Sequence, residues 1–212
     1  MMQKLSLIPA LLVASVMELA MPSETAAQQP KMDIKLFAGV SGTTYVSMLE
    51  TGRERDTFAG WQAGFGARVH RRKWFLEVLF SFNRWAFSQS TEDAGFEGTL
   101  KGRVNSFELP FNGGFIPYQN TYFKLFLYAG YVNHFNTKIL ADLSTPDGSA
   151  SAKFRPKEID LAIYQALARF GIGFDLFMFN IDFNYSISMN SATSTSYRTG
   201  YHQLQLNLAY LF

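Results

Sequence analysis

Residues 179–190 alternate strictly between apolar and polar side chains, and this alternation limits what the chain can fold into. The odd positions from Phe179 to Met189 are all large and apolar, whereas the even positions from Asn180 to Asn190 are all polar. A period of two predicts an extended strand whose side chains point alternately to two faces. One face of this strand must therefore meet an apolar medium, which is either a protein core or lipid.

The same alternation recurs along the chain and predicts eight strands. They fall at residues 33–43, 57–70, 74–87, 121–135 and 179–190, around Phe107, around Phe170 and at the C-terminus. Short links at residues 71–73, 117–120 and 175–178 alternate with long polar links at residues 45–56, 88–99, 137–157 and 191–199. Short turns on one side and long loops on the other are typical of outer-membrane barrels, so we expect both termini in the periplasm.

Two kinds of barrel can be built from eight amphipathic strands. A soluble lipocalin-like barrel turns its apolar face inward, whereas a membrane barrel turns it outward. Here the polar face carries charged residues beside many glycines, and the other face is rich in Phe, Leu and Ile. A water-facing surface would not carry so large an apolar area. The sequence therefore predicts an all-β fold, an eight-stranded antiparallel up-and-down transmembrane β-barrel in the outer membrane, with lipid against its apolar face.

Aromatic residues near the strand ends predict two girdles at the membrane interfaces, where such residues concentrate in barrels of this kind. We expect Trp74, Phe75 and Tyr122 at the short turns, and Trp61, Trp85, Tyr131 and Phe135 toward the long loops.

Composition excludes several classes of function. The formal net charge of +2 is too small to indicate nucleic acid as a partner. The chain has no cysteine, which rules out disulfides, thiol catalysis and the acylated cysteine of a lipoprotein. Only three histidines occur, and they are well separated, so we expect neither a transition-metal site nor another cofactor.

The first 27 residues have the pattern of an export signal. Lys4 supplies a positive charge, residues 5–17 are apolar, and small residues follow up to Ala27, after which we place the cleavage. The alternative is an N-terminal membrane anchor, for which the apolar run is short and interrupted by Pro9. We therefore expect a signal peptide at 1–27 and a barrel domain at 28–212.

Six charged residues fall on the side of the strands expected to face the lumen: Arg68, Glu77, Glu108, Lys124, Arg169 and Asp182. A two-residue turn at Arg72 and Lys73 would set Arg68 opposite Glu77, and we expect Arg169 and Asp182 to lie close together across a later hairpin. The set is either a selective pore or ligand cavity, or a charge-paired plug. Eight strands leave an interior just wide enough for side chains, which favours the plug.

Catalysis of acyl transfer usually needs a nucleophile, a base and an orienting group in contact. The predicted register sets no serine or carboxylate beside His70, His134 or His202 on adjacent strands. We therefore expect no catalytic residues in the barrel wall, although a site built from loop residues stays open.

The C-terminal strand ends on Tyr210 and Phe212, which resembles the signal that outer-membrane assembly machinery reads during insertion. The chain also resembles the PorT-like outer-membrane β-barrel family of Bacteroidota. The stretches that carry this resemblance are FELPF (107–111), YFKLFLYAGYVNHF (122–135), FGIGFDLFMFNIDFNYSISMN (170–190) and LQLNLAYLF (204–212). The resemblance implies an eight-stranded outer-membrane barrel; one founding member of the family is tied to a protein secretion system, and most relatives have no assigned role.

These observations predict a noncatalytic outer-membrane barrel that acts as a scaffold or accessory subunit of an envelope or secretion assembly. Its partners would be outer-membrane lipid and envelope proteins bound through extracellular loops, with residues 137–157, the longest loop, as the best candidate. One alternative is a transporter of a small or apolar solute, which requires a cavity around Gly64, Gly66, Gly171 and Gly173. The other is a lipid-modifying enzyme.

Overall fold

The computed structural model describes residues 30–49, 52–93, 96–145, 148–156, 161–191 and 199–212, and these ranges hold nine strands. The strands are β1 (Lys31–Leu49), β2 (Gly52–Arg71), β3 (Trp74–Asp93), β4 (Phe96–Gln119), β5 (Phe123–Thr145), β6 (Gly148–Phe154), β7 (Tyr164–Leu176), β8 (Phe179–Ser188) and β9 (Thr199–Leu211). The predicted signal peptide lies outside the described residues. No helix in the described ranges is long and apolar enough to cross a membrane.

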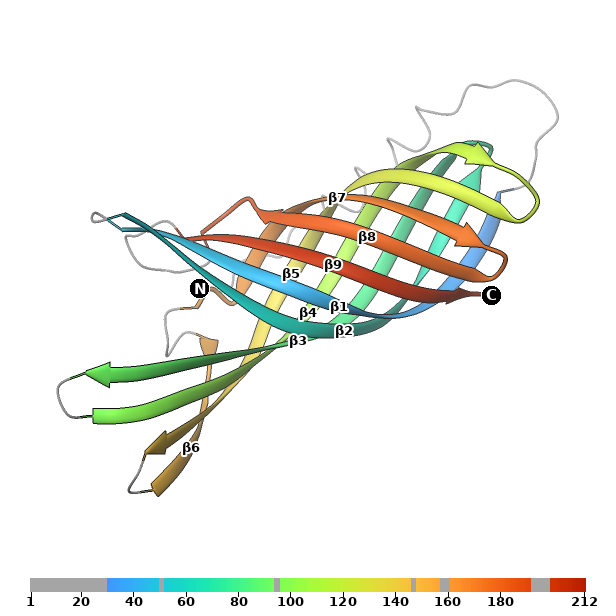
Figure 1. Ribbon diagram of the computed structural model, residues 1–212. Coiled ribbons are helices and arrows are strands. Elements are labelled where there is room, and N and C mark those ends of the chain that lie inside the picture. The colour runs from blue at the N-terminus through green and yellow to red at the C-terminus, as the bar shows by residue number, and fades with distance from the viewer. Residues whose placement is uncertain (1–29, 50–51, 94–95, 146–147, 157–160, 192–198) are drawn as a thin grey trace, which may run out of the picture.

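Eight of the strands close into an antiparallel barrel (Figure 1). Each pairs with the next along the chain except that β5 pairs with β7, and β9 returns to pair with β1 from Lys35↔Leu211 to Ser47↔Thr199. The remaining strand, β6, pairs with the far end of β5. The predicted eight-stranded barrel is confirmed, with β6 as an addition that the sequence did not reveal.

Two of the short turns contain two residues each. Arg71 pairs with Trp74, and Leu176 pairs with Phe179. The first residue of each turn, Arg72 or Phe177, has a positive φ of 57° or 54°. This conformation is uncommon for residues other than glycine, but two-residue hairpin turns require it because it matches the twist of the flanking strands.

Three of the four predicted long loops are largely strand, so that prediction was wrong. β1 and β2 stay paired up to Leu49↔Gly52, β3 and β4 up to Asp93↔Phe96, and β5 and β6 up to Thr145↔Gly148. The backbone ladder continues beyond the point where the apolar alternation ends. Most of the fourth predicted loop, residues 192–198, lies outside the described residues.

A four-stranded sheet extends beyond the barrel at the end opposite the C-terminus (Figure 1). β3 pairs with β2 only as far as Trp85↔Gly60, and β5 pairs with β7 only as far as Phe135↔Tyr164. Further out, β3 pairs with β4 alone, and β5 pairs with β4 and β6. We call this part the projecting sheet; it comprises residues 86–93, 96–105, 138–145 and 148–154.

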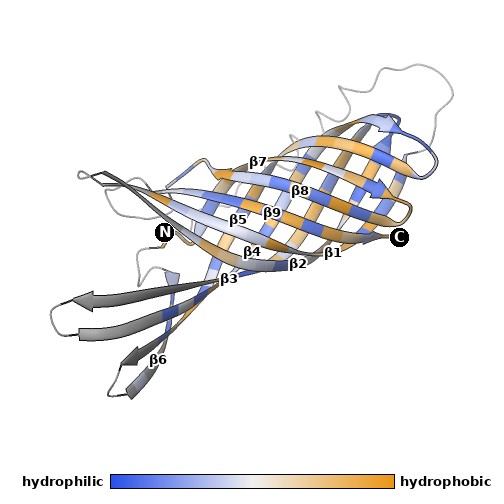
Figure 2. Ribbon diagram, viewed as in Figure 1, coloured by the Kyte–Doolittle hydropathy of each residue, from blue (hydrophilic) through white to orange (hydrophobic). Residues whose placement is uncertain are grey.

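Hydrophilic and hydrophobic residues alternate along the strands of the barrel wall (Figure 2), and the two kinds lie on opposite faces. On β8 the even residues from Asn180 to Ser186 are buried, whereas Phe179, Phe183 and Tyr185 are exposed. The exposed large apolar side chains of the other strands form the rest of an apolar belt around the barrel. A closed barrel with a polar interior and an apolar outer belt is the structure of an outer-membrane protein.

The aromatic girdles are confirmed in part. Trp74 and Tyr122 are exposed at the short turns, and Trp61, Tyr131 and Phe135 are exposed toward the other end of the barrel wall. The assignment of Phe75 and Trp85 to the girdles was wrong, because these side chains are only 4% and 5% exposed. Both lie at odd positions of β3, which point into the barrel together with Glu77.

Candidate functional site in the barrel interior

The half of the interior nearer the short turns holds a cluster of five charged side chains, which we call the Lys35 cluster: Lys35, Arg68, Glu77, Asp175 and Asp182. Arg68 Nε donates to Glu77 Oε2 over 3.0 Å, and Arg68 Nη1 lies 3.1 Å from Asp175 Oδ2. Lys35 Nζ lies 3.5 Å from Glu77 Oε2 and 3.5 Å from Asp182 Oδ2. The two cations thus join three carboxylates that come from three different strands.

Neutral groups complete the hydrogen bonding of these carboxylates. The Tyr128 hydroxyl donates to Asp182 Oδ1 over 2.6 Å, and Asn112 Nδ2 donates to Glu77 Oε1 over 3.2 Å. Asn180 Nδ2 donates to Asp175 Oδ1 over 2.7 Å. A buried charge is tolerated when ion pairs and hydrogen bonds replace its hydration, and each carboxylate of the cluster has both.

A second group of charges, the Glu108 cluster, lies nearer the projecting sheet. Arg169 Nη2 donates to Glu108 Oε2 over 2.7 Å, and His134 Nδ1 lies 3.1 Å from Glu108 Oε1. Arg169 Nε also donates to Ser186 Oγ over 2.9 Å. The second ring nitrogen of His134 lies 3.1 Å from Asn136 Oδ1. All of these side chains are almost fully buried.

Apolar layers lie on both sides of the two charge clusters along the barrel axis. Toward the short turns, Phe75, Ile116, Phe126 and Tyr128 pack together, and the Arg68 guanidinium lies 4.4 Å from the centre of the Phe126 ring. Toward the projecting sheet, two further clusters fill the interior: Val132, Leu167 and Tyr201, and Trp85, Val104 and Ile139.

A transporter would need a cavity around the inward-facing glycines, but large side chains cover them. A Cβ atom at Gly171 would collide with the Tyr128 ring, and one at Gly173 would collide with Phe126. On the other side of the barrel, a Cβ atom at Gly64 would collide with Phe37. These glycines make room for the side chains of the plug.

Five of the six charged residues predicted to face the lumen are buried inside the barrel, and Arg68 does lie opposite Glu77. Lys124 is half-buried at the N-terminal end of β5 and belongs to neither cluster. The predicted proximity of Arg169 and Asp182 was wrong. Arg169 lies opposite Ser186, and Asp182 lies opposite Gly173, so the two are four positions apart in register.

Sequence reasoning missed two charged interior residues, Lys35 and Asp175. It assigned Tyr128 and His134 to the lumenal side of their strand, where the structure has them, but did not connect either with the charges. Lys35 has the inward parity of its strand, which was the signal that could have found it. Asp175 had been assigned to a turn, whereas β7 continues through Leu176.

Two of the three histidines have a carboxylate neighbour that the predicted register had not placed beside them. His134 lies opposite Glu108, and His70 Nε2 lies 3.3 Å from Asp33 Oδ2. His202, on the outer face of β9, lies opposite Ile187, and its Nδ1 is 2.5 Å from the Tyr185 hydroxyl oxygen. Both ring nitrogens of His134 have partners other than a hydroxyl nucleophile. In the described ranges, no group of three or more His, Cys, Asp or Glu side chains is arranged to hold a metal ion.

The predicted insertion signal lies on the outer surface of the barrel. Tyr210 and Phe212 are exposed, and their ring centres are 4.7 Å apart. Phe212 is fixed by backbone hydrogen bonds in both directions with Ile34, of which Phe212 N to Ile34 O measures 2.9 Å. The role of these two residues in insertion stays a prediction.

No protein-family model matches the sequence, and no match is found among curated proteins. Solved structures of similar fold include the attachment invasion locus protein Ail of Yersinia pestis, with 17% sequence identity, 86% of this chain and 99% of that chain covered, and a TM-score of 0.47. They also include Neisserial surface protein A (9% identity, 84% and 97% covered, TM-score 0.42) and the outer membrane enzyme PagL (11% identity, 80% and 98% covered, TM-score 0.40). At these identities the similarity is one of fold.

Proposed function

We propose that this protein is a noncatalytic outer-membrane scaffold or accessory subunit that binds an envelope protein through its projecting sheet. The observation that carries this proposal is the free edge of that sheet. β6 pairs with β5 on one side, and within the described residues it pairs with no strand on the other. An open sheet edge is a template for pairing with an extended segment of another chain.

The composition of β6 suits this role. Its sequence, GSASAKF, consists mainly of small residues with a single charge at Lys153. Small side chains let a partner strand approach closely, so that its main chain can continue the ladder. The partner that we infer is therefore an extended segment of an envelope protein exposed at the outer end of the barrel.

The interior supports binding as the main activity rather than transport. The two charge clusters and the apolar layers occupy the volume that a solute path would need, because eight strands leave little room beyond their own side chains. Membership of the PorT-like family stays a prediction; if it holds, a subunit of a secretion system is the first partner to look for.

The test is crosslinking in living cells. A photo-reactive amino acid at Ala152 on β6 should capture a partner, and the same amino acid at Met32, exposed at the opposite end of the barrel, serves as a control. Two shortened variants are compared: one lacks residues 142–151 of the β5–β6 hairpin, and the other lacks residues 47–54 of the β1–β2 hairpin.

The proposal predicts an envelope protein that is crosslinked from Ala152, lost when the β5–β6 hairpin is shortened and kept when the β1–β2 hairpin is shortened. Recovery of the barrel alone from Ala152, or equal capture by both shortened variants, would contradict it. In that case, solute uptake and the lipid composition of the membrane become the measurements that separate the transporter from the enzyme.

A further inference from the structure

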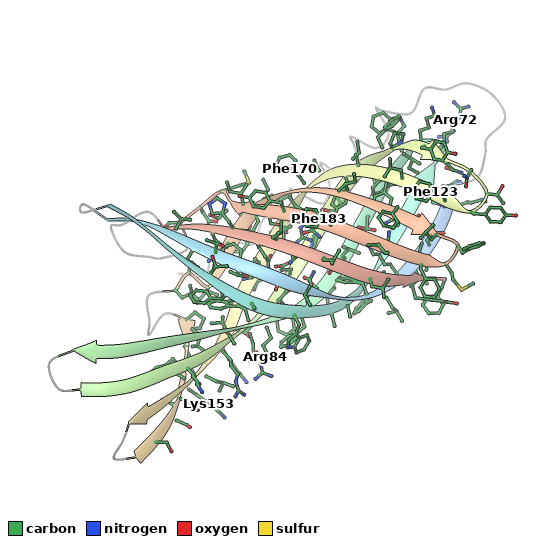
Figure 3. All side chains as sticks on the ribbon, in the orientation of Figure 1. Arg72, Arg84, Phe123, Lys153, Phe170 and Phe183 are labelled. Atoms are coloured by element: carbon green, nitrogen blue, oxygen red, sulfur yellow. The ribbon has the colours of Figure 1, made fainter. Side chains whose placement is uncertain are left out.

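Five basic residues lie on one face of the strands where the barrel wall continues into the projecting sheet. We call this set the basic face: Arg84 on β3, Lys101 and Arg103 on β4, Lys138 on β5 and Lys153 on β6. Four of them are exposed, and Arg84 is half-buried. Figure 3 labels Arg84 and Lys153, which lie on the same side of the strands.

The register shows that this face continues the lipid-facing wall. Phe82, Phe107 and Phe135 form one row across β3, β4 and β5, because Phe82 pairs with Phe107 and Phe107 pairs with Phe135. Residues that face each other across antiparallel strands share a side of the sheet. The next row outward on that side contains Arg84 and Lys138, each of which pairs with Asn105.

A bulge in β5 places Lys138 on this side. The ladder between β4 and β5 shifts between Asn105 and Ser106, with Thr137 as the extra residue. The extra residue reverses the parity of β5, so Lys138 points outward and Ile139 is buried. Beyond it, Arg103 pairs with Leu140, and Leu140 pairs with Lys153, which completes the next basic row.

The charge of the basic face is largely uncompensated. None of its five residues takes part in an ion pair among the side chains that the structure describes. The carboxylate that register places among them is Asp142, opposite Lys101, and it accepts a hydrogen bond from the Ser151 hydroxyl over 2.7 Å. Among the side chains that the structure describes on this face, five cations thus gather around a single carboxylate.

The basic face begins at the membrane boundary. Arg84 pairs with Trp61, a residue of the outer aromatic girdle, and the other basic residues lie further out along the same strands. Such girdles mark the level of the lipid headgroups. Long basic side chains at this level can lie along the apolar wall and hold their charged ends among the headgroups.

We propose that the basic face binds the phosphate groups of phosphorylated glycolipids in the outer leaflet. Arginine and lysine are the residues that bind phosphate, arginine through two parallel hydrogen bonds and lysine as a point charge. Because the basic residues share a face with the lipid-facing wall, the anion that reaches them most directly is a headgroup whose acyl chains lie against that wall. This inference does not depend on the proposed protein partner.

The test uses the purified, folded barrel in neutral detergent micelles and compares two lipids with the same acyl chains: diphosphoryl lipid A and dephosphorylated lipid A. Native mass spectrometry measures the apparent affinity of each. One variant, Arg103→Gln/Lys138→Gln/Lys153→Gln, removes three charges of the basic face. The control, Lys31→Gln/Arg72→Gln/Lys73→Gln, removes three exposed charges at the opposite end of the barrel. Heat-dependent gel mobility confirms that each variant is folded.

We expect the wild-type protein and the control to prefer the phosphorylated lipid, and the basic-face variant to bind it at least about tenfold more weakly, since each basic residue near a membrane surface contributes several-fold to anion binding. The affinity should also fall as salt is added. If the triple variant does not fold, the exposed single changes Lys138→Gln and Lys153→Gln should each weaken binding about threefold. Equal affinity for both lipids, or equal loss in variant and control, would overturn the proposal. Binding of a soluble sulfated oligosaccharide without binding of diphosphoryl lipid A would overturn the lipid as the ligand.

Discussion

Arg68 and Glu77 lie directly opposite each other on β2 and β3, and the Nε atom of Arg68 donates to Oε2 of Glu77 over 3.0 Å. Both side chains are almost fully buried. Around this pair, Lys35 and Asp175 each contact one of the two partners, and the Arg68 guanidinium lies on the Phe126 ring. The pair therefore joins the charged middle of the barrel to the apolar layer near the short turns.

Removal of either partner should destabilise the barrel. We expect Arg68→Ala and Glu77→Ala each to lower the free energy of unfolding by about 3 kcal/mol or more, because each leaves a buried charge with fewer partners. The double variant should cost less than the sum of the two. Urea unfolding in lipid vesicles measures this coupling. As a control, Arg68→Ala and Lys138→Ala should be additive within about 0.5 kcal/mol; additive effects for Arg68 and Glu77 would contradict the ion pair.

A charge on the lipid-facing side should be costly near the middle of the membrane. Phe183 is exposed at the centre of β8 (Figure 3). We expect Phe183→Arg to lower the free energy of unfolding by about 2–4 kcal/mol in bilayers, and Phe177→Arg, the same change at a short turn, by about 0–1 kcal/mol. Equal stability of the two variants would show that the apolar belt does not lie in lipid.

The glycine at position 171 should be required for the plug. Gly171→Ala places a methyl group against the Tyr128 ring, whose hydroxyl donates to Asp182. We expect a cost of about 1–3 kcal/mol, typical of an overpacked interior. Gly42→Ala is the matched control, since its Cβ atom would have no neighbour within 4 Å, and it should change the unfolding free energy by less than about 0.5 kcal/mol. A tolerated Gly171→Ala would mean that the interior has space to spare.

Much of the barrel wall could be predicted from the sequence because successive side chains of a spanning strand face the lipid and the interior in turn. Parity alone assigned Glu77 and Asp182 to the interior and Phe183 to the outer surface, as the structure has them. Phe75 and Trp85 were assigned wrongly because they were placed by their position along the strand, near its ends, without regard to their parity.

Contacts between strands could be predicted only where a turn was recognisable. The turn at Arg72 and Lys73 is polar and short, and the register that it implies is correct. The turn at Phe177 and Met178 consists of large apolar residues without glycine, asparagine or proline, so its exact position has no local signal. An error in that position moved Arg169 to the wrong partner, because each residue by which a turn shifts changes every pair in the hairpin.

The projecting sheet could not be predicted from the alternation. Outside the membrane neither face of a strand meets lipid, so apolar residues no longer mark every second position. The backbone of residues 86–93, 96–105, 138–145 and 148–154 nevertheless remains paired. A pattern that reports the surrounding medium therefore ends where that medium ends, even though the strand continues.

The chain forms a transmembrane barrel whose interior is filled by its own side chains. Solid-state NMR of the unmodified protein in bilayers tests both properties most directly, by measuring proton polarisation transfer to side chains from lipid acyl chains and from water. We predict fast transfer from lipid to Phe183 and Tyr185, and slow transfer from both sources to Lys35 Nζ and the Asp182 carboxyl carbon. Fast transfer from water to Lys35 and Asp182 would reveal an open aqueous pore, and absent transfer from lipid to Phe183 would contradict the transmembrane barrel itself.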